Sequence, residues 1–394
     1  MQFVWGNYKT LAWGKDELKP ASGTGQDNWG GLGVTLVDTL DTLWLMGLKN
    51  EFAEATAWVR DSLTFANAGS VSVFETTIRE LGGLLSAYDL SGEKVFLEKA
   101  QDLGDRLMPA FDTPSGLPVN NVEFRYLSHA TGNPIYASAV NKVEQIFDKY
   151  RTHHALVCSS SMIVDAAHYL LKVWLQGGKS EDSYRHAYDA AVDGMVTHLA
   201  KKTEPSGLLY FSDWDGTRNK LKMDHLACFM AGSLGLGAAT SEDKERAQRD
   251  MKLGKVKCDV QPTCTSMYLC LCAAFKGVKE YLLRPEVAES MFILHQLTGD
   301  PIFREWSWEI FEAIEKRCKT RYGYGAFRDV TNERSGPQDR MESFFLAETL
   351  KYLYLIQDTN QPIRLDTHVF NTEAHPLRIF GRDSIAAASH VASA

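Results

Sequence analysis

The feature that most constrains the fold is a turn motif that recurs along the chain. It reads as an apolar residue, Ser or Thr, Gly, an acidic residue or Asn, any residue, and then a β-branched and an aromatic residue. It occurs as LSGEKVF, ATGNPIY and LTGDPIF around Gly92, Gly132 and Gly299, and in looser form around Gly47 and Gly178. Glycine readily adopts the left-handed conformation that ends a helix, and the polar residue after it can cap the next helix. Each motif therefore indicates a turn between two antiparallel helices.

The segments on either side of these turns have the period of amphipathic helices. Apolar residues recur at three- and four-residue spacing in IRELGGLLSAY and FREWSWEIFEAI. The first four turns follow one another at intervals of 40 to 46 residues, and the longer interval before Gly299 leaves room for two more. About seven hairpins in one series predict an all-α toroid of paired helices, with an open helical solenoid as the alternative. Near the C-terminus, RLDTHVFNTEAHPL (364–377) predicts a short β-hairpin.

Carboxylates interrupt the apolar runs on the first helix of several hairpins. In a ring of hairpins the inner helices run parallel, so we expect these carboxylates to meet at one mouth. Arg79 follows Glu75 by four residues and Arg284 precedes Glu286 by two, so both guanidinium groups can hold a carboxylate or a sugar hydroxyl. The carboxylates are Asp38, Asp41, Glu75, Asp165, Glu286, Glu289 and Glu342.

A single acidic residue in a first helical turn usually only stabilises the helix dipole. Several buried together repel one another and require arginines, a cation or a reaction. Two classes of function fit: a glycosidase, in which one carboxyl group protonates the leaving oxygen and another activates water, and a cation-dependent binding protein whose carboxylates hold calcium. His225, in KMDHLACF, fits either a ligand-binding position or a packed helix.

Composition excludes some partners and leaves the compartment open. The net charge of −8 argues against nucleic acid. No apolar window is long enough to span a membrane, and the first twenty residues lack a basic segment followed by an apolar run. The seven cysteines fit no metal-binding spacing, and no Asn-x-Ser/Thr glycosylation acceptor is present.

Several motifs, taken in order, resemble the class I α-1,2-mannosidases, glycoside hydrolase family 47. They are DELKP, LVDTLDTLWLMGL, VFETTIRELGGLLSAYDLSG, YLLKVWLQGGK, KMDHLACF, LLRPEVAES, MESFFLAETLKYLYL and VFNTEAHPL, spread from about residue 5 to 380. The resemblance implies one (α/α)₇ barrel domain over residues 1–380, closed at one end by a C-terminal β-hairpin, with residues 381–394 as a tail. It also implies a Ca²⁺-dependent inverting enzyme that trims terminal α-1,2-linked mannose from high-mannose N-glycans on glycoproteins.

The resemblance also implies roles for individual residues. Glu75 matches the general acid, thought to act through a water, Glu286 the base that activates the attacking water, and Asp165 a second catalytic acid. Thr372, in NTEAH, matches the residue that binds Ca²⁺ through its carbonyl and hydroxyl oxygens. Cys228 and Cys264 match a disulfide pair, which implies an oxidising compartment. The residues expected at the substrate or in the water shell of the calcium are Arg79, His225, Arg284, Glu289, Glu342 and Glu373, with Asp38 and Asp41 also expected at the substrate.

An inverting enzyme needs its two carboxyl groups about 6.5–9.5 Å apart, with a water between them. Acids on different inner helices can meet that requirement, whereas neighbours within one helical turn cannot. Glu286 and Glu289 are therefore not expected to form the acid/base pair with each other.

The chain departs from the family pattern in two places, near residues 119–123 and 150–162, where it is shorter. The first shortening removes a segment that carries an active-site Glu. At the second, the chain reads DAAHYLLK, so that His168 replaces an active-site acid, and Ile163 stands where family members carry Arg or Leu. These losses suggest an alternative function: a weakened or inactive glycan-binding relative that recognises misfolded glycoproteins for degradation from the endoplasmic reticulum.

The resemblance implies a location in the lumen of the endoplasmic reticulum or Golgi. Family members carry a signal anchor before the catalytic domain, and this chain begins close to where that domain begins. We therefore expect a full-length form that is a type II membrane protein, a catalytic domain without a transmembrane segment, and a monomer.

Overall fold

The chain folds mainly into helices, which a computed structural model describes over most of its length. The structure does not describe residues 67, 113–120, 142–159, 206, 208, 215–217, 222, 224, 256–278, 333 and 382–394, and it describes residues 121 and 160–166 by their backbone only. The shortened segments near 119–123 and 150–162, the tail and Cys264 therefore lie wholly or largely outside the described residues.

Most described elements are helical. The α-helices are α1 (Gln2–Leu11), α2 (Val34–Asp38), α3 (Leu40–Leu45), α4 (Lys49–Asp61), α5 (Val73–Thr76), α6 (Gly82–Ser91), α7 (Lys94–Leu107), α8 (Asn121–Thr131), α10 (Ser160–Gln176), α11 (Asp182–His198), α12 (Met230–Ala239), α13 (Lys244–Gly254), α15 (Glu286–Thr298), α16 (Ile302–Arg317) and α17 (Leu350–Gln357). Two segments are 3₁₀ helices, η2 (Met108–Phe111) and η3 (His225–Phe229), and two are π-helices, η1 (Thr77–Leu81) and η4 (Phe345–Thr349).

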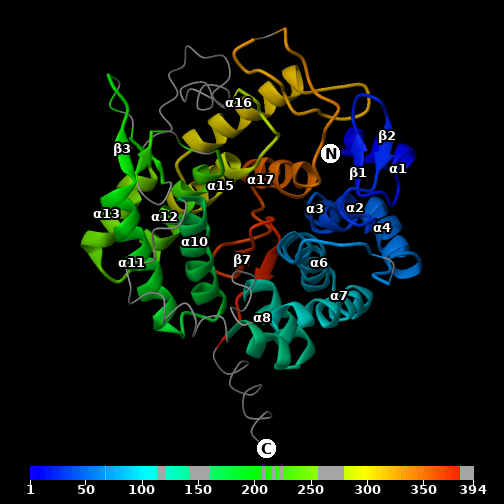
Figure 1. Ribbon diagram of the computed structural model, residues 1–394, viewed down its shortest axis with the longest axis horizontal. Helices are drawn as coiled ribbons and strands as arrows, with labels where there is room; N and C mark the ends of the chain where they lie inside the picture. The colour runs from blue at the N-terminus through cyan, green and yellow to red at the C-terminus, as the bar shows by residue number, and fades with distance from the viewer. Residues whose placement is uncertain are drawn as a thin grey trace, which may run out of the picture.

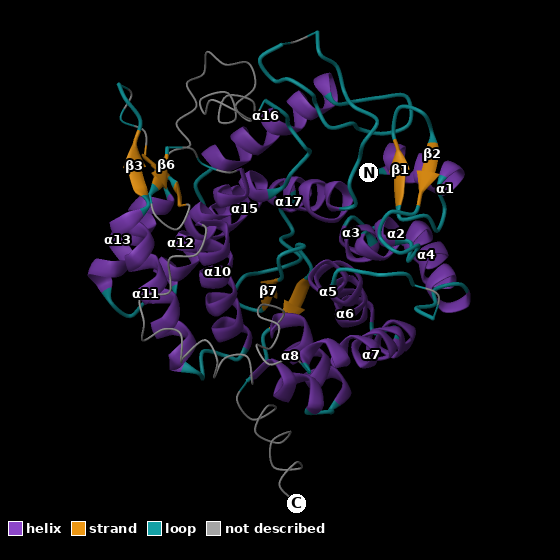
Figure 2. Cartoon of the chain, in the orientation of Figure 1, coloured by secondary structure: helices purple, strands orange, loops and turns teal. Residues whose placement is uncertain are grey.

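Within the described part of the chain, the strands form four short antiparallel pairs, several of which are labelled in Figure 2. They are β1 (Glu17–Lys19) with β2 (Thr24–Gln26), β3 (Ala200–Lys202) with β4 (Leu209–Phe211), β5 (Asp213–Trp214) with β6 (Asn219–Lys220), and β7 (His368–Phe370) with β8 (Pro376–Arg378).

The helices are arranged around a central region that holds β7 (Figure 1). Consecutive helices pack as pairs, among them α6 with α7, α10 with α11, α12 with α13, and α15 with α16. The π-helix η4, near the end of the chain, packs against α2 and α3, which lie near the beginning of the chain. The all-α prediction is confirmed, whereas a closed barrel of seven hairpins stays a prediction.

The predicted turns are present where the glycine motifs occur. Gly92 ends α6 and Gly299 ends α15, with φ angles of 74° and 67° that disfavour a side chain at Cβ. Gly47, Gly132 and Gly178 also have positive φ. Each motif therefore stops one helix and allows the chain to reverse.

Helices α15 and α16 show how the sequence distinguishes inner from outer helices. In α15 every residue from Glu286 to Leu294 is buried, including the polar Glu286, Glu289 and Ser290. In α16 the buried residues are spaced by four, three and four, which is the pattern of a helix with one face in solvent. They are Phe303, Ser307, Ile310 and Ile314.

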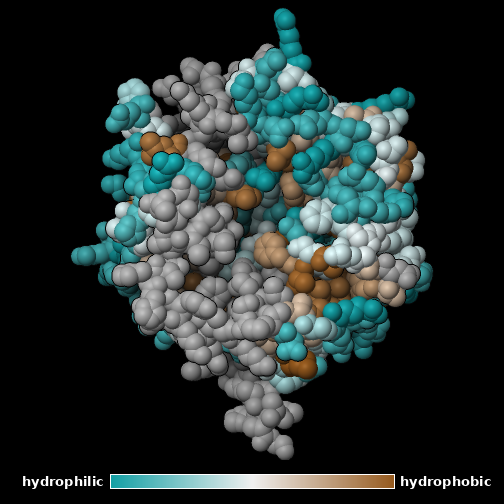
Figure 3. Space-filling view, viewed as in Figure 1, coloured by the Kyte–Doolittle hydropathy of each residue, from teal (hydrophilic) through white to brown (hydrophobic). Residues whose placement is uncertain are grey.

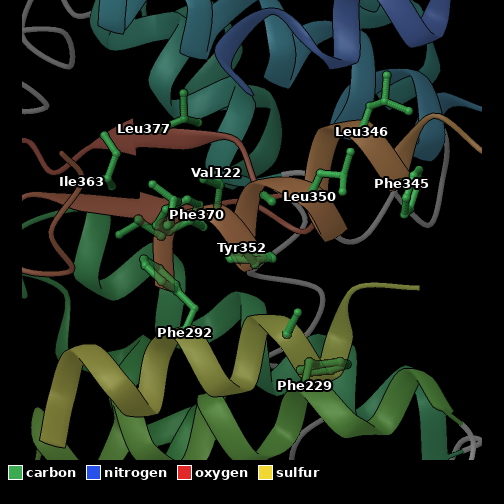
Figure 4. Packing of buried hydrophobic residues seen from close by; sticks show 14 of the residues in the cluster. Val122, Phe229, Phe292, Phe345, Leu346, Leu350, Tyr352, Ile363, Phe370 and Leu377 are labelled. Carbon is green, nitrogen blue, oxygen red and sulfur yellow. The ribbon is translucent and has the colours of Figure 1, made fainter. Parts of the chain in front are cut away.

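The C-terminal hairpin packs into the core between inner helices. Its Phe370 ring lies 5.3 Å from that of Phe292 on α15 and 5.6 Å from that of Tyr352 on α17, measured between centroids (Figure 4). The strands pair Val369 with Leu377, both buried. The short hairpin predicted in this segment is confirmed, and its connecting loop lies among the inner helices.

Buried charges hold that loop in place. His375 is fully buried, with Nδ1 2.8 Å from an Asp41 oxygen and Nε2 3.0 Å from an Asp38 oxygen. Lys351 of α17, also fully buried, lies 2.8 Å from the other Asp41 oxygen and donates to the carbonyl oxygen of Ala374 at 2.7 Å. Isolated charges would be costly here, so this network is stable only when all of its members are present.

The buried carboxylate of Asp16 holds the segment of chain that leads into α2. Asp16 accepts hydrogen bonds from four backbone N–H groups of the segment before α2. They are those of Trp29, Gly31, Leu32 and Gly33, at 2.7 to 2.9 Å. A buried carboxylate with this many donors is well compensated. Asp16 therefore fixes the loop that carries Trp29 beside the inner helices.

None of the described helices combines the length and the apolar character that a membrane crossing requires.

We expect Lys351→Met to destabilise the fold by about 3–5 kcal/mol, because it leaves buried Asp41 without its ammonium partner. Chemical denaturation measures this loss. Lys9→Met is the control: Lys9 pairs with Glu54 where both side chains are 46% exposed, and its loss costs less than about 1 kcal/mol. Equal losses in the two variants would show that the buried network does not hold the hairpin.

Candidate active site

Arg79 connects the predicted general acid to the C-terminal hairpin. Its Nε and Nη2 atoms lie 2.9 and 2.8 Å from Glu75 Oε2, as the four-residue spacing on one helix face predicted. Its Nη1 atom pairs with Glu373 and donates to the Ser343 hydroxyl at 3.2 Å. Arg79 is 8% exposed, whereas the Glu75 side chain keeps 28% of its surface accessible. Arg79 therefore fixes the orientation of the Glu75 carboxyl group, while part of the Glu75 side chain stays accessible to solvent.

The two π-helical segments lie at this site. The segment η1 carries Arg79 and Glu80, and η4 carries Glu348; all three side chains are buried. A π-helical turn widens the helix and shifts the direction of its side chains, and such turns are frequent at functional sites. The widened turns bring charged residues of two inner helices toward the centre.

A strained backbone position lies three residues before α15, the helix that carries the predicted base. Leu283 has a φ of 62°, unusual for a residue other than glycine, and its carbonyl oxygen accepts from the Thr349 hydroxyl at 2.6 Å. Glu286, the first residue of α15, has Oε2 2.8 Å from Nδ1 of His225 in η3. The structure thus places His225 against Glu286, and its expected role in substrate binding stays a prediction.

Glu289 faces two basic groups of α10. Its Oε1 atom lies 3.5 Å from Nε2 of His168 and 3.5 Å from Nζ of Lys172. Burial opposes ionisation of Glu289, but the Lys172 ammonium and His168 outweigh it, so the pKa of Glu289 is lowered. Burial and the Lys172 charge lower the pKa of His168 to about 4, so this imidazole is neutral at neutral pH.

Glu348 completes the group of carboxyls on the inner helices. Burial, together with the charges of Glu286 and Glu289, raises the pKa of Glu348 well above its usual value. The carboxyl groups of Glu286 and Glu289 on α15 thus disfavour ionisation of Glu348 in η4. Sequence analysis missed Glu348; the only signal was an acidic residue inside the apolar run FFLAETLKYL.

The hairpin loop presents Thr372 and Glu373 to these helices. Asn371 Oδ1 accepts from the backbone N–H groups of Glu373 and His375 at 2.8 and 2.9 Å, which fixes the loop. The Asn371 carbonyl oxygen accepts from Lys172 at 3.0 Å. Thr372 Oγ1 lies 2.8 Å from the hydroxyl of Tyr169 on α10.

Other predicted residues take different places. Asp38 and Asp41 are fully buried and contact His375, so their expected contact with substrate stays a prediction. Arg284 is partly buried just before α15. Glu342 is 8% exposed and accepts a hydrogen bond from Arg340.

Two predictions fall partly outside the described residues. Asp165 has its backbone in α10, one turn before Tyr169, but its side chain is not described. Cys228 is buried in η3, and Cys264 is among the residues that the structure does not describe. The second catalytic acid and the disulfide therefore stay predictions.

A metal ion here would have few direct protein ligands. Within the described ranges, no group of three or more His, Cys, Asp or Glu side chains is arranged to hold one. The donors near the hairpin loop are nevertheless oxygens, from Thr372, Tyr169 and the inner carboxyls. Such a set fits a hard cation that keeps much of its water.

Comparison with known proteins tests the family resemblance. The profile of glycosyl hydrolase family 47 matches residues 1–124 and 121–379. The chain is 39% identical to mannosyl-oligosaccharide 1,2-alpha-mannosidase MNS1 of Arabidopsis thaliana, over 97% of this chain and 78% of that protein. It is 38% identical to the endoplasmic reticulum mannosyl-oligosaccharide 1,2-alpha-mannosidase of Homo sapiens, over 96% of this chain and 62% of that protein.

A solved structure confirms the fold. The alpha-1,2-mannosidase from Trichoderma reesei superposes with a TM-score of 0.83 at 27% identity, covering 96% of this chain and 97% of that one. The motifs, the helical fold and the extent of the similarity together show that this chain belongs to glycosyl hydrolase family 47, the class I α-1,2-mannosidases.

Proposed function

We propose that this chain is a Ca²⁺-dependent, inverting α-1,2-mannosidase that removes terminal mannose from high-mannose N-glycans on glycoproteins. The observation that carries the proposal is that Glu75 and Glu286 project from different helices, each with its own basic partner, Arg79 and His225. The similarity to mannosyl-oligosaccharide 1,2-alpha-mannosidases supports the substrate class.

Glu75 and Glu286 would take opposite roles in proton transfer, one as acid and the other as base. Glu75 would deliver a proton, through a water, to the oxygen of the leaving sugar, while Arg79 fixes its carboxyl group. Glu286 would take a proton from the attacking water on the other face of the sugar, and His225 would orient it. Carboxyl groups on separate helices can lie about 6.5–9.5 Å apart, the separation that inversion requires for a water between acid and base.

Thr372 would hold Ca²⁺ through its carbonyl and hydroxyl oxygens, with waters and sugar hydroxyls as the remaining ligands. Bound there, the cation would supply positive charge that orients the sugar hydroxyls. Glu289 and Glu373 would accept hydrogen bonds from the surrounding waters. The closeness of Glu286 and Glu289 to Glu348, whose pKa they raise, supports a cation in this region, because a positive charge would ease the crowding of carboxyl groups.

The proposal extends to organisation and location. Residues 1–380 would form one (α/α)₇ barrel domain, shortened near 119–123 and 150–162, that acts as a monomer. Asp165 would serve as a second catalytic acid, and a Cys228–Cys264 disulfide would fit the lumen of the endoplasmic reticulum or Golgi. The human relative is named an endoplasmic reticulum mannosidase, which supports that location.

One observation favours a second function, glycan binding with little hydrolysis. His168 is buried beside Glu289 and neutral at neutral pH, where the family pattern has an acid. A weakened enzyme of this kind would bind high-mannose glycans and recognise misfolded glycoproteins. It would show Ca²⁺-dependent glycan binding without release of mannose.

We expect Glu286→Gln to lower kcat about 10³-fold with little change in KM, because the amide is isosteric but cannot act as a base. The assay follows mannose released from a high-mannose oligosaccharide. Glu309→Gln, an exposed change on outer helix α16, should leave both constants unchanged. Substantial turnover by the Glu286 variant would show that another group is the base.

Removal of calcium provides a separate test. After treatment with EGTA we expect mannose release to fall to background and the unfolding temperature to drop, because a ligand of the native state stabilises it. Added Ca²⁺ should restore both. Thr372→Val, which replaces the hydroxyl by a methyl group, should require more Ca²⁺ for the same activity. Full activity in the chelated protein would contradict the calcium proposal.

A further inference from the structure

The loop of the C-terminal hairpin is attached to α10 at two points that lie one helical turn apart. Helix α10 packs against β7 and α6 packs against β8, so the hairpin contacts both helices. On the face seen in Figure 3, hydrophobic side chains gather over α6. The Tyr169 hydroxyl oxygen lies 2.8 Å from that of Thr372, and Lys172 donates to the carbonyl oxygen of Asn371 at 3.0 Å. Because residues three apart lie on one face of a helix, both groups meet the same stretch of loop.

Thr372 differs from its neighbours in exposure. Asn371 and the residues from Glu373 to Leu377 are buried, whereas Thr372 is partly exposed. Tyr169, its partner on α10, is only 5% exposed, so bulk water has little access to it. Thr372 thus has a buried hydrogen-bond partner and keeps part of its own surface open to a ligand.

The chemistry of the Thr372 hydroxyl group determines the direction of this hydrogen bond when a cation is bound. A threonine hydroxyl group has one proton to donate and two lone pairs that can accept. A hard cation such as Ca²⁺ would take a lone pair of Oγ1, so the proton would point away from the cation and need an acceptor. The Tyr169 hydroxyl oxygen, at 2.8 Å, is within hydrogen-bond distance and can accept that proton.

We propose that Tyr169 is a positioning residue of the calcium site, which accepts the Thr372 hydroxyl proton and so directs an oxygen lone pair at the cation. The inference rests on the proposed function, in which Thr372 binds Ca²⁺. Lys172 fixes the backbone just before Thr372, whereas Tyr169 fixes its side chain. The two contacts from α10 together orient both oxygens that bind the cation.

The test measures Ca²⁺ affinity directly, by isothermal titration calorimetry of chelator-treated protein with CaCl₂. Tyr169→Phe keeps the ring and removes only the hydroxyl group. We expect its Kd for Ca²⁺ to be about fivefold higher than that of wild type, the effect of losing one hydrogen bond. Tyr136→Phe is the matched control: it removes a hydroxyl group that donates to Asp105 of α7 at 2.6 Å, and it should leave the Kd unchanged.

Variants of Thr372 distinguish positioning from a general loss of structure. In Thr372→Ser, which keeps the hydroxyl group, Tyr169→Phe should raise the Kd by the same factor as in wild type. In Thr372→Val, which keeps the carbonyl ligand but has no hydroxyl group, Tyr169→Phe should have no further effect. Equal Kd values for wild type and Tyr169→Phe, or an equal further loss in the Thr372→Val background, would overturn the proposal.

Stability and turnover provide separate readouts. A given concentration of Ca²⁺ should raise the unfolding temperature less in Tyr169→Phe than in wild type or Tyr136→Phe, because weaker binding stabilises the native state less. At saturating Ca²⁺, Tyr169→Phe should release mannose at the wild-type rate. A rate that stays low at saturating Ca²⁺ would contradict a role through the cation.

Two outcomes separate this inference from the proposed function. If wild type failed to bind Ca²⁺, the proposed calcium dependence would be refuted, and this inference with it. If wild type and Tyr169→Phe differed in Ca²⁺ affinity as expected but neither released mannose, this inference would stand and the proposed activity would be refuted.

Discussion

The structure depends most on the buried pairing of His375 with Asp38 and Asp41. These three side chains are fully buried, and with Lys351 they join a loop near the C-terminus to helices α2, α3 and α17. The loop could not lie among apolar helices without such compensation, because its polar backbone would lose water. The network therefore determines where Thr372 and Glu373 lie, and with them the proposed calcium and sugar site.

Around this loop the inner helices combine apolar packing with a small number of charges. Arg79 is shared by Glu75 and Glu373, Lys172 lies near Glu289 and binds the loop, and burial beside Glu286 and Glu289 raises the pKa of Glu348. The charges are thus divided among the helices rather than concentrated in one turn. This division gives the carboxyl groups different surroundings, which is how one site can hold both an acid and a base.

Much of the fold could be predicted from the sequence. The glycines at 92 and 299, the period of the helices and the short hairpin were all predictable, because each is a local property of the chain. The contact between Glu75 and Arg79 followed from their spacing. In contrast, the π-helical turns and the pairing of His375 with Asp38 and Asp41 depend on tertiary packing. No pattern within one element could reveal them.

The central claim is that carboxyl groups from different inner helices act on opposite faces of one sugar. The configuration of the first-released mannose tests it most directly, by ¹H NMR of the anomeric protons in the opening minutes of hydrolysis of an α-1,2-linked mannoside. Inversion predicts that β-mannose appears first and then mutarotates. Release of α-mannose first would contradict the account, because it would require a carboxylate that attacks the sugar itself.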